Sequence, residues 1–185
     1  HALGQDTLQN VTGDSRIVVS AWNYAGWRGV FYPPRLPHKR ELAHASRAFR
    51  TIEINGTHYS MQRPKDFVRW AEETPEDFIF AVKGSRYITH MMKLRNPEAG
   101  LANFFAQGIL RLGPKLGPIL WQFGPNFPFD RARIEPFLAL LPRDTEGALA
   151  LARRHDHRVA GRAWLKIDKK RKLRHAMEIR HESFV

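Results

Sequence analysis

The run Phe78-Ile79-Phe80-Ala81-Val82 consists of five apolar residues, several of them aromatic or β-branched, and the polar Lys83 follows directly. Such a run is typical of a strand in a parallel sheet, where helices cover the faces. Four other short segments share this character and are predicted to be strands as well. They are residues 17–20, 51–54, 119–123 and 176–179.

Segments with apolar residues at helical spacing separate the predicted strands. They begin near residues 37, 64, 96 and 129, and Pro64 and Asp130 stand where helices typically start. Strands that alternate with helices form βαβ units and a parallel sheet. The sequence therefore predicts an α/β domain over residues 17–185, after a flexible N-terminal segment of residues 1–16.

Residues 144–175 interrupt this alternation and are predicted to form a basic helical insertion before the last strand. The segment holds ten Lys and Arg against four Asp and Glu, which is +6 of the chain's net charge of +12. Its densest part is Lys169-Lys170-Arg171-Lys172. Such a run is either a solvated face or a contact to a phosphate backbone, and the sequence leaves both open.

Composition excludes several classes of function. The chain has no cysteine, so it has no disulfides, no thiolate catalysis and no zinc–thiolate site. Its apolar runs are too short to span a bilayer and no secretory signal is recognisable, so we expect a cytoplasmic protein without a membrane partner. The excess of basic residues, 30 against 18 acidic ones, favours an anionic small molecule or nucleic acid as a partner.

Polar and aromatic residues follow every predicted strand. Ligands of parallel α/β sheets bind beyond the carboxyl ends of the strands, so these residues are expected to line one pocket. In chain order the candidates are Trp22, Tyr24, Glu53, Asn55, Tyr59, Lys83, Arg86, His90, Gln122, Asn126, Glu178, Arg180 and His181.

Two carboxylates and two histidines are the candidate catalytic groups. Glu53 and Glu178 are interpreted either as acid/base groups or as partners in ion pairs that brace the sheet. His90 and His181 are interpreted either as proton carriers or as hydrogen-bonded structural residues. Together with His58 they would also suit a divalent metal, although no HExxH or similar spacing supports a metal site.

The remaining candidates are assigned to ligand binding. Three cations, Lys83, Arg86 and Arg180, suit an anion such as phosphate. The amides of Asn55, Gln122 and Asn126 would fix its polar groups. The rings of Trp22, Tyr24 and Tyr59 would stack on a base or sugar, or else pack within the loops.

The chain resembles the YecE-like family, the domain of unknown function numbered seventy-two. The resemblance rests on matches in order along the chain. They include Ser20-Ala21-Trp22-Asn23-Tyr24, Glu53-Ile54-Asn55, Phe80-Ala81-Val82-Lys83, Gln122 with Pro125, and Glu178 with Arg180-His181.

The resemblance implies a TIM-like barrel and no settled activity. A barrel of this kind has eight strands and about 250 residues, so this chain is expected to hold the first five strands only. The sequence departs from the family pattern at Ala21, where glycine is usual, at Phe184, where tryptophan is frequent, and at His58, where an aromatic residue is common.

Three functions are compatible with these features. The first is an enzyme that acts on a phosphorylated or nucleic-acid-derived ligand at the strand ends. The second is a non-enzymatic nucleic-acid-binding module that uses the basic insertion and the rim aromatics. The third is an interaction protein whose basic insertion docks an acidic partner.

Overall fold

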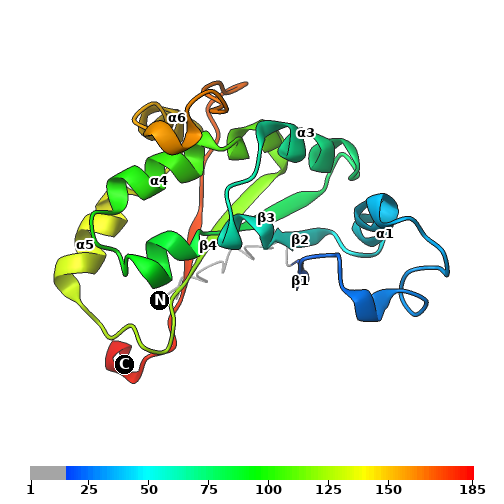
Figure 1. Cartoon of the computed structure of the whole chain (residues 1–185), viewed down its shortest axis with the longest axis horizontal. Helices are drawn as coiled ribbons and strands as arrows, with labels where there is room; N and C mark the ends of the chain where they lie inside the picture. Colours follow the sequence, from blue (N-terminus) through cyan, green and yellow to red (C-terminus); the bar gives the residue numbers. More distant parts are fainter. Residues whose placement is uncertain (1–15) are drawn as a thin grey trace, which may run out of the picture.

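The computed structural model describes residues 16–185, and the segment predicted to be flexible lies outside the described residues except for Arg16. Within this range five strands form one sheet in the order β1-β2-β3-β4-β5, and every neighbouring pair is parallel (Figure 1). Their bounds are β1 Val18–Ser20, β2 Thr51–Ile54, β3 Ile79–Lys83, β4 Leu116–Gln122 and β5 His175–Glu178. The predicted α/β class and parallel sheet are confirmed.

The strand order identifies the sheet as a barrel wedge. In doubly wound sheets the order reverses at a switch point, whereas strands of a TIM-like barrel follow one another around the axis. Here the order runs from β1 to β5 without reversal. The barrel is not closed, because β1 and β5 do not pair with each other.

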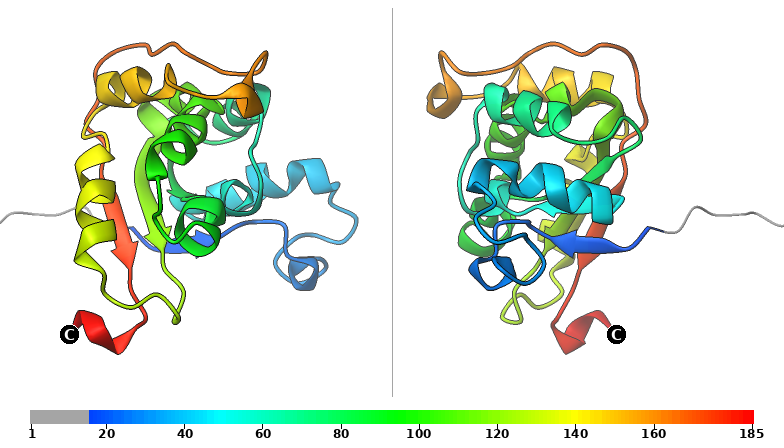
Figure 2. Two further views of the ribbon diagram at one scale, coloured as in Figure 1. Left: turned by 60° about the vertical axis from the view of Figure 1, so that its left-hand side comes forward. Right: turned by 90° about the vertical axis from the view of Figure 1, so that its right-hand side faces the viewer.

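Helices connect the strands and lie along one side of the sheet (Figure 2). The α-helices are α1 Glu41–Ala48, α2 Gly56–Tyr59, α3 Pro64–Glu72, α4 Pro97–Ala106, α5 Arg131–Leu140 and α6 Thr145–Ala152. Short 3₁₀ segments are η1 Ala25–Trp27, η2 His38–Arg40, η4 Ile109–Lys115, η5 His157–Val159 and η6 Glu182–Phe184, while η3 Tyr87–Met91 is one turn of π-helix.

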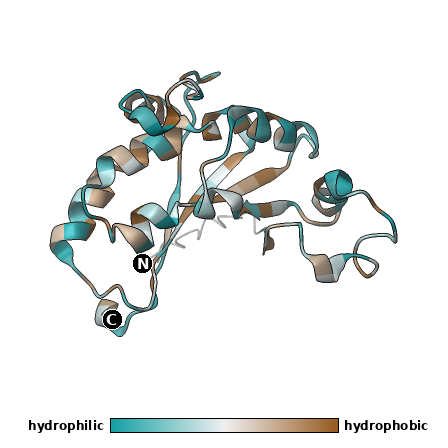
Figure 3. Ribbon diagram, viewed as in Figure 1, coloured by the Kyte–Doolittle hydropathy of each residue, from teal (hydrophilic) through white to brown (hydrophobic). Residues whose placement is uncertain are grey.

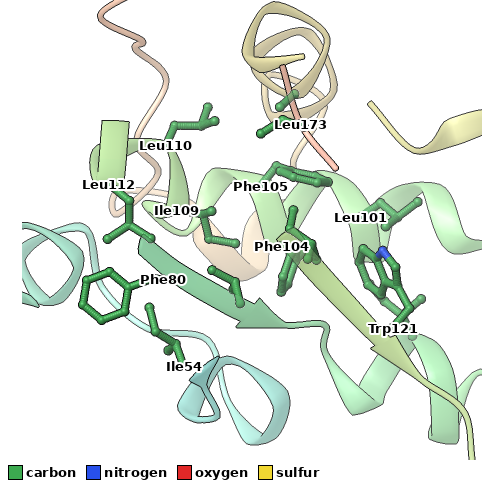
Figure 4. Close-up of a cluster of buried hydrophobic side chains, with 14 of the residues drawn as sticks. Ile54, Phe80, Leu101, Phe104, Phe105, Ile109, Leu110, Leu112, Trp121 and Leu173 are labelled. Atoms are coloured by element: carbon green, nitrogen blue, oxygen red, sulfur yellow. The ribbon is translucent and has the colours of Figure 1, made fainter. Parts of the chain in front are cut away.

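The core lies between the sheet and these helices. Side chains alternate between the faces of a strand, and Phe80 and Trp121 point to the helical side, where they are buried. The ring of Trp121 lies 5.3 Å from that of Phe104 on α4 (Figure 4). It also lies 5.2 Å from the ring of Phe137 on α5. The central strands are accordingly hydrophobic (Figure 3).

The other face of the sheet is concave and open. It forms a groove of about 630 Å³ whose walls include Val18, Glu53, Ala81, Leu120 and Ala176. One face of the sheet is therefore covered by helices, and the other is the inner wall of the barrel wedge.

The segment predicted to be a basic helical insertion is helical only in its first part. Helix α6 and the short η5 account for the helical turns, and residues 160–174 form an extended strap. The strap is held by tertiary hydrogen bonds, in which Trp164 N donates to Ala106 O over 2.8 Å and Thr145 Oγ1 donates to Lys169 O over 2.9 Å. These contacts compete with helix formation, which the sequence pattern did not reveal.

None of the helices within residues 16–185 is long and apolar enough to cross a membrane.

A substitution at the end of β3 tests the packing between sheet and helices. A Cβ atom on Gly84 would lie 2.3 Å from Cε3 of Trp121, which is fully buried and has no room to move. We expect Gly84→Ala to lower the free energy of unfolding by about 1–3 kcal/mol, as overpacked cores do. Urea unfolding followed by circular dichroism measures the change.

Gly26→Ala is the matched control, since no heavy atom of the described residues lies within 4 Å of the added Cβ atom. Equal stability of the two variants would contradict the packing described here.

Candidate functional site

Four polar side chains meet on the concave side where the strands end. Glu53 is the last residue of β2 whose side chain faces the concave side. Lys83, Gln122 and Glu178 are the corresponding last residues of β3, β4 and β5. The parallel register pairs Gln122 with Glu178, and Ser20 of β1 with Glu53. We call this group, Ser20, Glu53, Lys83, Gln122 and Glu178, the mouth.

Glu53 is the buried carboxylate of the mouth. Ser20 Oγ donates a hydrogen bond to Glu53 Oε1 over 3.0 Å, and Asn55 Nδ2 donates to Ser20 Oγ over 2.6 Å. Lys83 Nζ lies 3.9 Å from Glu53 Oε1, with side chains 13% and 7% exposed respectively. This loose ion pair leaves Glu53 Oε2 without a hydrogen-bond donor among residues 16–185.

Glu178 is held more tightly than Glu53. It accepts hydrogen bonds from Gln122 Nε2 over 2.8 Å and from Arg180 Nε over 2.7 Å. Burial favours its neutral form, but these hydrogen bonds and the charges of Arg180 and Lys83 together hold the pKa of Glu178 below its ordinary value. Lys83 therefore interacts electrostatically with both carboxylates of the mouth.

Two histidines lie beside the mouth with their rings 5.4 Å apart. His58 Nδ1 shares a 2.8 Å hydrogen bond with Gly84 O, and His90 Nδ1 shares one of 2.8 Å with Thr89 Oγ1. Burial lowers the pKa of His90, and the charges of Arg180, Lys83 and Arg86 lower it further. Burial is also the main cause that lowers the pKa of His58. At neutral pH both rings are uncharged and able to accept a proton.

The predicted stacking aromatics of the first loop pack against protein. The ring of Trp22 lies edge-on to Trp70 of α3 at 5.5 Å, so it belongs to the helical side of β1. Tyr24 donates its hydroxyl hydrogen to Ser20 O and lies 5.1 Å from the ring of Trp27. The sequence had left aromatic packing open for both rings, and these contacts match it.

Other predicted residues lie at the edge of the mouth or away from it. Asn126 is exposed in the turn after β4 and close to Gly124, against which His90 also packs. His181 Nδ1 pairs with Ser183 Oγ over 2.9 Å, beyond the end of β5. Tyr59 and Arg86 contact each other, with the guanidinium 5.3 Å from the ring centre, and line a separate pocket on the helical side.

Sequence reasoning missed Ser20 as a site residue, and it considered His58 only as an alternative metal ligand or proton carrier. The signal for Ser20 was its period-two spacing from Val18, which puts it on the same face as Glu53 across the β1–β2 pair. His58 is buried within the short helix α2, and a four-residue helix leaves no clear periodicity in the sequence.

One departure from the family pattern has a structural explanation. Ala21 follows β1 with φ of 60°, in the left-handed region that glycine adopts at little cost. Its backbone N–H donates to Glu53 O over 2.9 Å, which fixes the first loop against β2.

Within the described residues, 16–185, no three His, Asp or Glu side chains are grouped so that they would hold a metal ion. The carboxylates of the mouth are instead engaged by Ser20, Gln122, Lys83 and Arg180.

The basic run lies at the opposite end of the sheet from the mouth, because it precedes β5 whereas the mouth follows the strands. Lys170 Nζ lies 2.9 Å from Glu146 and 3.4 Å from Asp144, and Arg171 lies 2.5 Å from Asp168. Local acids thus neutralise part of the run.

Comparison with known proteins finds the family model "Protein of unknown function DUF72" over residues 16–185. Among curated proteins, the chain is 29% identical over 109 residues to the UPF0759 protein YunF of Bacillus subtilis, covering 55% of this chain and 39% of that protein. It is 30% identical over 102 residues to the UPF0759 protein YecE of Escherichia coli, covering 55% of this chain and 37% of that one.

Solved structures give the same family. A DUF72 family protein from Thermotoga maritima superposes with a TM-score of 0.54 and 27% identity, covering 74% of this chain and 52% of that chain. One from Enterococcus faecalis has a TM-score of 0.53 at 15% identity, covering 67% and 45%, which supports the fold alone. The chain thus matches about two fifths of the curated relatives and about half of these structures.

The histidines beside the mouth predict a pH dependence of stability. Their pKa values in the folded state are lowered, so between these values and the ordinary value of about 6.5 the unfolded chain binds more protons. Stability is therefore expected to fall as the pH decreases below about 6.5. His58→Gln and His90→Gln should each reduce that slope by a fraction of one proton, less than about 1.4 kcal/mol per pH unit.

Urea unfolding at a series of pH values measures the slope, and NMR of the imidazole rings follows the same protonation directly. An unchanged slope in both variants, or rings that become protonated above pH 6.5, would overturn the described environment of these histidines.

Proposed function

Because the chain belongs to the DUF72 family, "Protein of unknown function DUF72", its activity has to be inferred from its own residues, and we propose that the mouth is the active site of an enzyme acting on a phosphorylated or nucleic-acid-derived small molecule. Since the chain matches only part of its relatives, the proposal concerns this part of the barrel.

The observation that carries the proposal is the incomplete pairing of the cations around His90. The charges of Lys83, Arg86 and Arg180 all contribute to lowering the pKa of His90. Within the mouth, Glu53 pairs with Lys83, and Glu178 pairs with Arg180. Lys83 is also poorly paired, since its ammonium group lies 3.9 Å from the nearest oxygen of Glu53. An anion bound here would gain charge-assisted hydrogen bonds that the protein leaves unmade, and phosphate suits such a site.

The two carboxylates differ in how many hydrogen bonds their oxygen atoms accept. Glu178 accepts hydrogen bonds from Gln122 and Arg180, which stabilise its ionised form and orient Arg180 toward a ligand. Glu53 accepts one hydrogen bond from Ser20, and its other oxygen, Oε2, has no donor among the described residues 16–185. We assign Glu53 as the acid/base group, Glu178 as its ionised counterpart and neutral His90 as a second proton carrier.

A buried polar atom beside Glu53 supports a hydroxyl-bearing ligand. Asn55 Oδ1 is buried and has no hydrogen-bond partner within the described part of the chain, although Asn55 Nδ2 is bonded to Ser20. A buried acceptor without a donor costs free energy. A ligand hydroxyl would satisfy it and lie next to Glu53, as the sugar of a sugar phosphate or nucleotide would.

The nucleic-acid-binding alternative has less support. It requires the basic run and the rim aromatics to contact one ligand, yet the run precedes β5 and the mouth follows it, and Lys170 and Arg171 are paired with nearby acids. Trp22 is also packed against Trp70. No observation therefore favours this alternative over the enzyme.

Paired ligands that differ by one phosphate test the proposal. Ribose, glucose and adenosine are compared with their monophosphates by thermal shift, and conversion is followed by mass spectrometry. We expect at least one phosphorylated member to stabilise the protein and to be converted. Lys83→Met should weaken its binding about tenfold or more, whereas Glu53→Gln should retain binding and lose conversion.

Lys65→Met, on the exposed face of α3, is the control for loss of one lysine charge. If phosphorylated compounds bind no better than their parents, or if Lys83→Met binds them as well as the unaltered protein, the anion site is wrong. Binding without conversion would contradict the assignment of an enzyme.

A further inference from the structure

We propose that a second pocket, formed between α2, η3 and α4 on the helical side of the sheet, binds a small organic carboxylate with an apolar body. The pocket has a volume of about 250 Å³, and we call it the side pocket. Its walls come from Tyr59 and Met61, from Arg86, Tyr87 and Met91, from Phe104, and from Arg158 of η5.

The inner walls of the side pocket are apolar. Met61 and Met91 line it together with the buried ring of Phe104. Gly100 of α4 also lines it, and the absence of a side chain there lets Ile88 pack closely against the helix. Methionine adapts its shape to small apolar ligands. A pocket of this size and lining suits one aromatic ring or a short aliphatic chain rather than a nucleotide.

Two guanidinium groups line the pocket beside tyrosine rings. The guanidinium carbon of Arg86 lies 5.3 Å from the ring centre of Tyr59, and that of Arg158 lies 5.7 Å from the ring centre of Tyr87. Within residues 16–185 no carboxylate forms an ion pair with Arg86, so its hydrogen-bond donors are available to a ligand. An apolar pocket with an unneutralised guanidinium in its wall selects a molecule with one apolar part and one anionic group.

Neighbouring residues of the basic insertion, residues 144–175, hold Arg158 in place. Asp156 accepts from Arg158 N over 2.8 Å and pairs with Arg158 Nη1 over 2.5 Å. Asn103 of α4 holds Asp156 in turn, with two hydrogen bonds of 3.0 Å in opposite directions. Part of the basic insertion thus has a role in the fold that its charge alone did not indicate: it closes one side of the side pocket.

The side pocket is distinct from the mouth. Thr57 separates them, since it lines the side pocket while its hydroxyl donates to Lys83 O over 2.6 Å. Helix α4 forms one wall of the side pocket, so the pocket lies on the outer layer, whereas Lys83 and Glu53 face the concave side. The two proposals can therefore fail independently.

Methionine methyl groups report on the side pocket directly. The chain has four methionines, and Met61 and Met91 line the side pocket while Met177 lies in β5. Methyl-labelled protein of the full 185-residue chain is titrated with phenylacetate, with phenylacetamide and with acetate. We expect phenylacetate to shift the Met61 and Met91 signals, to leave Met177 unchanged, and to bind about fivefold or more tightly than the neutral amide. Acetate should have little effect, because it lacks the apolar body.

Arg86→Gln should remove the preference for the acid over the amide, and Arg158→Gln should reduce it. Arg131→Gln, an exposed arginine of α5, is the matched control and should bind as the unaltered chain does. Lys83→Met should also leave phenylacetate binding unchanged, which separates this site from the mouth. The proposal is overturned if the acid and the amide bind equally, if acetate acts as strongly as phenylacetate, if Met177 responds instead, or if no signal shifts.

Discussion

Backbone hydrogen bonding between parallel strands is the constraint on which the other features depend. Each strand pairs with its sequence neighbour, from β1 to β5, and this orientation puts the ends of all five at one rim. Side chains that are far apart in the sequence, such as Glu53 and Glu178, thereby come to share the cation Lys83. An antiparallel neighbour would have moved one of them to the opposite end of the sheet.

The mouth contains buried charged groups that are only loosely paired with each other. Glu53 and Lys83 are almost fully removed from water, yet Lys83 Nζ lies 3.9 Å from Glu53 Oε1. Asn55 Oδ1 is buried and has no donor among the residues that the structure describes. Such an arrangement costs free energy. A ligand that supplied an anion to Lys83 and a hydroxyl to Asn55 would recover that cost, which is the physical basis of the proposed function.

The loop after β3 connects the two proposed sites. His90 of η3 belongs to the surroundings of the mouth, whereas Tyr87 and Met91 of the same turn line the side pocket. η3 is a π-helical turn, a geometry often found at functional sites. Arg86 lines the side pocket, and its charge contributes to lowering the pKa of both His58 and His90.

The sequence alone determined the five strands, their alternation with helices and the convergence of Glu53, Lys83, Gln122 and Glu178, because strand periodicity and the sidedness of parallel sheets are local or general rules. Only the tertiary structure decided which neighbours each side chain has. It assigned Tyr59 and Arg86 to the side pocket, packed Trp22 against Trp70, and turned about half of the basic segment into a strap, since contacts between distant segments outweigh local preference. It also brought Ser20 and His58 to the mouth, through a strand register and a buried turn that no local pattern specifies.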